Sequence, residues 1–191
     1  AFVPTAGGLY DWLVDANPDG SLAPGIAERW QIAPDGLSWF FHIRKGVKFH
    51  DGVELTGEDV KFSIDRILDP KATSSMAPQV RDQVKKVERL DPHTVVVYTN
   101  GVQVELEYQF SPMLGGEGAV VPKHYVEKVG AKEFAQQPLG SGPWKFVKRA
   151  PGESIRYEAN EDYWGKVPDF KYLTLLVVPE EGTRVAMLRK G

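Results

Sequence analysis

Three Asp-Gly pairs at regular spacing constrain the first part of this 191-residue chain more than any other feature. They are Asp19-Gly20, Asp35-Gly36 and Asp51-Gly52. Glycine adopts positive φ without steric cost and aspartate tolerates it, so such pairs favour tight turns. Between the second and third pairs, residues 38–44 alternate with the two-residue period of a strand. We therefore expect strands joined by turns here, with a further short strand over residues 47–50.

The clearest helix begins after Thr56, whose hydroxyl can cap the first turn. Asp59, three residues later, is a shorter version of the acid in a capping box. The apolar residues that follow share one helical face: Val60, Ile64, Ile67 and Leu68. Pro70 is expected to end the helix.

The segment Pro138–Pro143 is the strongest break in the chain and is predicted to be a domain boundary or crossover. The elements expected before it are a loop over 69–82, a hairpin over 84–90 and 94–99, a glycine-rich loop over 115–118, and a helix over 123–137 that starts at Pro122 and can break at Gly130. Those expected after it are strands over 144–148, 154–158 and 172–178 and a helix over 183–190. Because strands and helices do not alternate regularly, the order predicts a mixed α/β (α+β) fold.

Composition excludes several classes of protein. Lys and Arg number 23 against 26 Asp and Glu, so we expect neither nucleic-acid binding nor a polybasic membrane arm. The absence of cysteine excludes disulfides, thiolate zinc sites and a cysteine nucleophile. There is no apolar run long enough to span a bilayer. The first residues show no signal-peptide pattern, so we expect such a segment to have been cleaved or to lie outside this sequence.

A search for catalytic patterns finds no enzyme. His50 and Asp51 are adjacent in sequence and would point to opposite faces of a strand, so His50 is interpreted as structural. Gly140-Ser141-Gly142 lacks the G-x-S-x-G pattern of a nucleophile elbow, and residues 115–118 lack the Lys and Ser/Thr of a phosphate loop. We expect no catalytic residue, no metal site and no cofactor. Each of the five tryptophans is compatible with a ligand platform, but packing in a core is the favoured interpretation for each.

Long ordered motifs carry a family resemblance. They lie at residues 22–30, 34–52, 55–63, 138–146, 160–165 and 179–191. Together they resemble the signature of family 5 extracellular solute-binding proteins, the dipeptide, oligopeptide and nickel-type periplasmic binding proteins of ABC importers. The departures are Gly57 where alanine is usual and Ser141 where threonine is usual.

This resemblance implies a partial periplasmic binding protein-like II fold, in a fragment that lacks the C-terminal lobe. Residues 1–8 would be a remnant of domain I, residues 9–137 a domain II-like unit, and residues 138–191 part of domain I. Gly142 and Trp144, beside the crossover, are the candidates for lining the ligand cleft.

The function implied is capture of a peptide-like or other small solute for the permease subunits of an ABC importer. The whole protein would be monomeric and periplasmic or otherwise extracytoplasmic, with a lipid anchor as one option. The fragment alone would bind ligand poorly. Three alternatives stay open: a β-rich carbohydrate-binding module, a non-transport sensor or chaperone with the same fold, and a hydrolase.

Overall fold

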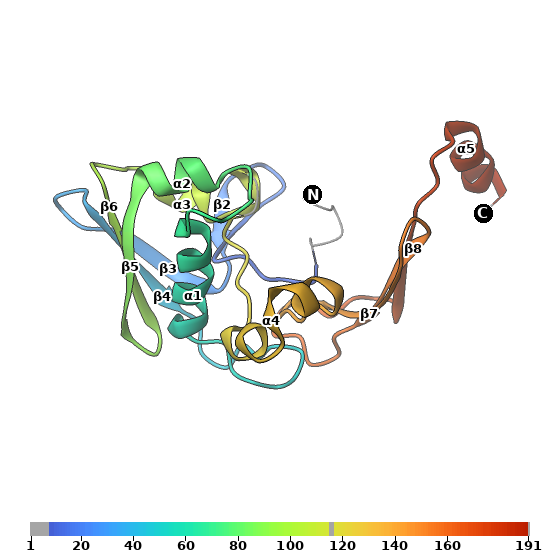
Figure 1. Cartoon of the computed structure of the whole chain (residues 1–191), viewed down its shortest axis with the longest axis horizontal. Coiled ribbons are helices and arrows are strands. Elements are labelled where there is room, and N and C mark those ends of the chain that lie inside the picture. Colours follow the sequence, from blue (N-terminus) through green and yellow to red (C-terminus); the bar gives the residue numbers. More distant parts are fainter. Residues whose placement is uncertain (1–7, 115–116, 191) are drawn as a thin grey trace.

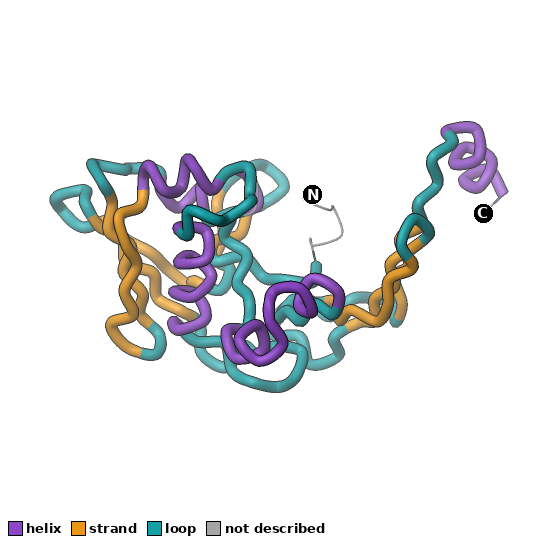
Figure 2. Tube along the Cα trace, viewed as in Figure 1, coloured by secondary structure: helices purple, strands orange, loops and turns teal. Residues whose placement is uncertain are grey.

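The computed structural model describes residues 8–114 and 117–190. The chain forms a first part, built on a four-stranded sheet with helices against it, and an arm of three strands that extends away from it (Figure 1). A helix lies at the tip of the arm (Figure 2). Residues 1–7 of the expected remnant and residues 115–116 of the expected glycine-rich loop lie outside the described residues.

The strands are β1 Val14–Ala16, β2 Leu22–Pro24, β3 Ala27–Ile32, β4 Ser38–Ile43, β5 Val84–Asp91, β6 Thr94–Thr99, β7 Trp144–Ala150, β8 Ser154–Ala159 and β9 Tyr172–Leu176. The helices are α1 Gly57–Leu68, α2 Ala77–Gln83, α3 Leu106–Gln109, the 3₁₀ helix η2 Pro112–Leu114, α4 Lys123–Gln136 and α5 Glu181–Lys190. The mixed α/β fold class is therefore confirmed.

The four-stranded sheet is antiparallel, in the order β3-β4-β6-β5. Trp39, Phe41 and Ile43 of β4 are buried while the residues between them are half-buried, which confirms the strand predicted over 38–44. The hairpin β5–β6 confirms the predicted pair of strands after residue 84. Sheet and core thus follow from alternation that is visible in the sequence.

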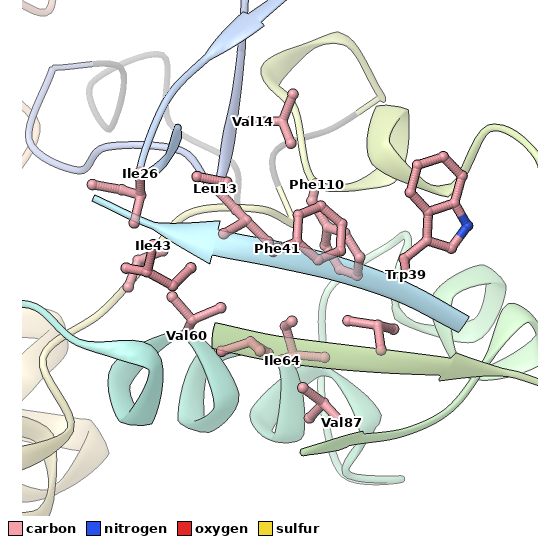
Figure 3. Packing of buried hydrophobic residues seen from close by; sticks show 14 of the residues in the cluster. Leu13, Val14, Ile26, Trp39, Phe41, Ile43, Val60, Ile64, Val87 and Phe110 are labelled. Carbon is pink, nitrogen blue, oxygen red and sulfur yellow. The ribbon is translucent and has the colours of Figure 1, made fainter. Parts of the chain in front are cut away.

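Helix α1 covers one face of this sheet. The Thr56 side chain accepts a hydrogen bond from the Glu58 N–H, and Asp59 completes a capping box, as predicted. Figure 3 shows Val60 and Ile64 projecting from α1 into the cluster of buried residues, and both side chains are at most 2% exposed. This burial of aliphatic side chains holds the helix against the sheet.

Two predictions in the first part are wrong. Residues 47–50 form no strand, and their only β-type pairing is the isolated bridge between Lys48 and Glu54, because the chain reverses at Gly52, where φ is 89°. The loop predicted over 69–82 contains α2. Pro78 stands in the first turn of this helix, where its missing N–H costs no hydrogen bond, so it starts the helix instead of preventing it.

Helix α4 has the expected interruption, since Gly130 has a φ of 79° inside it. Pro122 is the N-cap residue and not the first helical residue, which corrects the prediction by one position. The α4 side chains Val126 and Phe134 form a second, small core with Val121. Tyr10 packs against this core, so the beginning of the described chain is tied to α4.

The arm consists of the antiparallel sheet β7-β8-β9 followed by α5. Its strands and its helix confirm those predicted after the break. No residue of α5 that the structure describes is buried, and Leu188 is 84% exposed. The arm therefore depends for its position on the contacts where it leaves the first part.

Candidate functional site

The arm leaves the first part at a region that we call the joint: residues 8–11, His50, residues 140–143 and residues 160–164. Its base is a close approach of two backbones. The Gly142 N–H donates to the Leu9 carbonyl at 3.0 Å, and the Trp144 N–H donates to the Gly8 carbonyl at 2.9 Å. A Cβ atom on Gly140 would lie 1.9 Å from the Leu9 oxygen, and one on Gly142 would lie 2.4 Å from the Gly8 oxygen. Only glycine fits at these two positions.

Within the joint, His50 makes three hydrogen bonds to the segment 140–143. Its backbone N–H donates to the Gly140 carbonyl at 2.8 Å. Its ring Nδ1 accepts from the Gly140 N–H at 3.3 Å, and its Nε2 lies 2.9 Å from the Gly142 oxygen. Because Nδ1 accepts, the proton of the neutral ring is on Nε2, which donates. Burial lowers the pKa of His50, in keeping with a neutral ring.

The motif around residues 160–164 completes the joint. Buried Asn160 donates from its backbone to the Pro143 oxygen at 2.8 Å and from Nδ2 to the Gly142 oxygen at 3.2 Å. Asp11, 7% exposed, accepts from the Tyr163 hydroxyl at 2.7 Å and from the Trp164 Nε1 at 3.0 Å. Burial and the Asp11 charge raise the pKa of Tyr163, so the phenol stays a donor.

Beside the joint lies a hollow of about 540 Å³. Its charged lining residues are Lys48, Lys145, Glu161 and Asp162. His50, Tyr163 and Trp164 also line it, so this hollow lies next to the motif contacts. Its volume is within the range of small-ligand sites, and its mixed charges suit a small polar ligand that carries both signs.

Of the two cleft candidates from the sequence, Gly142 lies in the joint and Trp144 directly follows it, and neither lines this hollow. Gly142 is buried with its N–H and its carbonyl oxygen hydrogen-bonded. Trp144 is half-buried, and its ring centroid lies 5.0 Å from that of Phe170. Neighbouring residues of a strand face opposite ways, so Lys145 reaches the hollow and Trp144 does not. Their role as cleft residues stays a prediction.

The charged residues of the hollow are not among the site residues predicted from the sequence, although each lies in one of the family motifs. The family motifs are recognised by their glycines and aromatic residues, which form turns and pack in the core. Lys48 lies in the motif over residues 34–52 and Asp162 in the motif over residues 160–165, and the fold brings both to the hollow. Contacts between such distant segments leave no periodic signal in a sequence.

The structure bears on two of the alternatives. None of the five tryptophans, all in described residues, is exposed, which opposes a carbohydrate-binding module with a tryptophan platform. Ser141 is fully buried and its hydroxyl has no hydrogen-bond partner, while both ring nitrogens of His50 are bonded to backbone. The joint therefore contains no activated serine nucleophile.

Within the described residues, no three His, Cys, Asp or Glu side chains are grouped so that they could hold a metal ion. Over the same residues, the helices are too short or too polar to cross a bilayer.

Comparison with known proteins identifies relatives of the chain. Residues 21–191 match the family described as bacterial extracellular solute-binding proteins, family 5 middle. The dipeptide-binding protein of Escherichia coli is 30% identical over 96% of this chain and 38% of its own length.

Solved structures agree. The periplasmic binding protein AgaA, in complex with agropinic acid, has a TM-score of 0.87 at 32% identity, over 96% of this chain and 36% of that one. Helicobacter pylori DppA, an ABC transporter-associated periplasmic binding protein in complex with the peptide STSA, has a TM-score of 0.86 at 30% identity, over 97% and 40%. The chain thus spans well under half the length of these relatives, and its fold is that of part of a periplasmic binding protein. It belongs to family 5 of the bacterial extracellular solute-binding proteins.

Proposed function

We propose that this chain is part of the substrate-binding component of an ABC importer, which captures a peptide-like or other small solute outside the cytoplasmic membrane and delivers it to the permease. Membership of the family over residues 21–191 is the observation that carries this proposal. The likeness to a dipeptide-binding protein and to a peptide-bound DppA supports a peptide-like solute. The likeness to AgaA, whose structure contains agropinic acid, supports including other small polar solutes in the proposal.

The proposal includes a division of the chain. Residues 9–137 act as the domain II-like unit, and residues 138–191 act as part of domain I, which the joint attaches to it. Two separate sheets on either side of the break support this division. Gly142 and Trp144 are proposed as cleft residues because the arm leaves the first part there. The function is that of a binding protein and not of an enzyme.

In the whole protein, hinge closure of two lobes would bury the solute. Burial of about 70–90% of a ligand requires walls on both sides. The chain of 191 residues spans 38% of the E. coli dipeptide-binding protein, so it is expected to supply only part of such walls. Residues 1–191 alone should therefore bind the solute much more weakly than the protein encoded by the whole gene.

Titration calorimetry on both forms tests this function. The probes are a dipeptide mixture, a tetrapeptide, the nickel–histidine complex and agropinic acid. We expect the whole protein to bind at least one probe with micromolar or tighter Kd, and residues 1–191 to bind it at least about a hundredfold more weakly. Binding of none by the whole protein, or equal binding by both forms, would contradict the proposal. Deletion of the gene should also abolish uptake of the bound probe; unchanged uptake would favour a sensor.

A further inference from the structure

A second hollow, of about 520 Å³, lies in the first part, away from the joint. It is formed by α2, the segment that follows β6, α3 and η2. Figure 1 shows α2 and α3 at the upper edge of the first part, whereas the arm leaves from the lower right. Nothing in the proposed function uses this hollow.

The lining is rich in carboxamides. Four of the seven glutamines in the chain face it, with one tyrosine and one acid. These six residues are Gln79, Gln83, Gln103, Gln109, Tyr108 and Glu105. A carboxamide offers a hydrogen-bond acceptor and two donors on one flat group, so four of them form a site with many donors and acceptors and little charge.

Two of these carboxamides lack partners although they are buried. Gln109 is only 4% exposed, and its Oε1 makes no hydrogen bond within the described part of the chain. The Oε1 of Gln83 is likewise buried and unbonded there. A buried polar atom without a partner costs about 1–3 kcal/mol, so folded proteins seldom keep one that nothing satisfies. Both side chains line the hollow, so a ligand there could supply the missing hydrogen bonds once the two carboxamides turn toward it.

The walls are held in place before any ligand arrives. The Asn100 N–H donates to the Gln83 carbonyl at 2.9 Å, and its side-chain amide donates to the Asp82 carbonyl at 2.8 Å, which ties the end of β6 to α2. The Trp39 Nε1 donates to the Gln103 carbonyl at 2.7 Å, which fixes the segment after β6. Because these walls are already ordered, little binding free energy is lost in ordering them when a ligand binds.

The rest of the lining indicates the class of ligand. Of the described residues around the hollow, none is Lys, Arg or His, so the carboxylate of a free peptide or an organic acid would have no cation to pair with. Val102 and Val104, 63% and 67% exposed, and Leu114, 42% exposed, provide apolar contact. Hydroxyl groups both donate and accept, so they match a carboxamide in either orientation.

We infer that the hollow between α2, residues 102–105 and α3 is a binding site for a small neutral polyhydroxyl ligand, a sugar being the simplest. The ligand hydroxyls would bond to Gln83 and Gln109, and the C–H faces of the ring would lie against Val102, Val104 and Tyr108. This site is distinct from the solute cleft of the proposed function and does not depend on it.

Saturation-transfer NMR followed by calorimetry on residues 1–191 tests this inference. The probes are glucose, maltose and cellobiose, with glycylglycine as a zwitterion and spermidine as a cation. We expect a saccharide to bind with a Kd of about 1 mM or tighter, and Gln109→Ala to weaken it at least about tenfold by removing a hydrogen bond. Gln79→Ala, at an exposed position on the rim, provides a second variant in case Gln109→Ala does not fold, and should weaken binding about threefold or more.

Gln136→Ala is the matched control, because Gln136 is exposed on α4 and does not line the hollow; it should leave the saccharide Kd unchanged. Three results would overturn the inference: no saccharide binds, spermidine or glycylglycine binds and the saccharides do not, or saccharide binding is the same in the hollow variants as in the control. Because the saccharides are not among the probes of the solute-cleft assay, failure of one assay leaves the other proposal standing.

Discussion

Gly140→Ala should destabilise the fold strongly, since the joint has no room for a methyl group at this position. The new Cβ would lie 1.9 Å from the Leu9 oxygen, and ordinary contact begins at 3.4 Å, so the Leu9 carbonyl must move by 3.4 − 1.9 = 1.5 Å. That movement breaks the 3.0 Å hydrogen bond from the Gly142 N–H, which costs about 1 kcal/mol. Overpacking adds about 1–3 kcal/mol, so the expected loss is about 2–4 kcal/mol.

Urea unfolding followed by tryptophan fluorescence measures this loss. Gly101→Ala is the matched control, because a Cβ there meets nothing within 4 Å and its φ is not positive. We expect the control to stay within about 0.5 kcal/mol of the parent. If Gly140→Ala lost less than about 1 kcal/mol at an unchanged m-value, the reasoning that close backbone approach builds the joint would be refuted.

Three further results are expected from the joint. Asp11→Asn leaves one acceptor oxygen for two donors, so it should lower the free energy of unfolding by about 2 kcal/mol. The control Asp15→Asn, at an exposed position, should change that free energy by under about 0.5 kcal/mol. Equal effects of the two substitutions would contradict a special role for Asp11. Burial lowers the pKa of His50 in the folded chain, so the unfolded chain takes up a proton first as the pH falls. The free energy of unfolding should therefore fall as the pH is lowered below about 6.5, whereas above that pH His50 causes no such loss. His50→Gln should flatten that fall in a urea series over pH, and an unchanged slope would exclude His50 as its cause. Ser141→Ala removes a buried hydroxyl without a partner and should raise the free energy of unfolding by about 1 kcal/mol; a drop would show that the hydroxyl is satisfied.

The elements that the sequence predicted correctly depend on near neighbours. The cap at Thr56 and the alternation along 38–44 involve residues a few positions apart, so their physical cause is visible in the sequence. The missed helix α2 also has a local cause, because Pro78 stands in its first turn, where a proline favours the start of a helix. The false strand over 47–50 failed because Gly52 reverses the chain before a second pair can form.

The sequence predicts the break at residues 138–143, but it does not predict which contacts form the joint there. Its central contacts join His50 to Gly140 and Gly142, about 90 positions away, and Asp11 to Trp164, further still. Periodicity reports only which residues of one element share a face. Which elements meet is decided by packing over the whole chain, so the bonded state of Gly142 and the direction of Trp144 could not be read from their motif.

The chemistry of the joint explains why its motifs identify a family and not a ligand. The Gly142 carbonyl receives hydrogen bonds from His50 and Asn160, and both Asp11 carboxylate oxygens are bonded to aromatic donors. Groups already bonded to one another have little capacity left for a solute. Structures of nearly equal likeness to this chain contain agropinic acid in one case and a peptide in the other, so the shared framework is compatible with different solutes. Selection among solutes must therefore come from side chains outside these bonds, which is where substitutions that change the ligand without unfolding the chain should be sought.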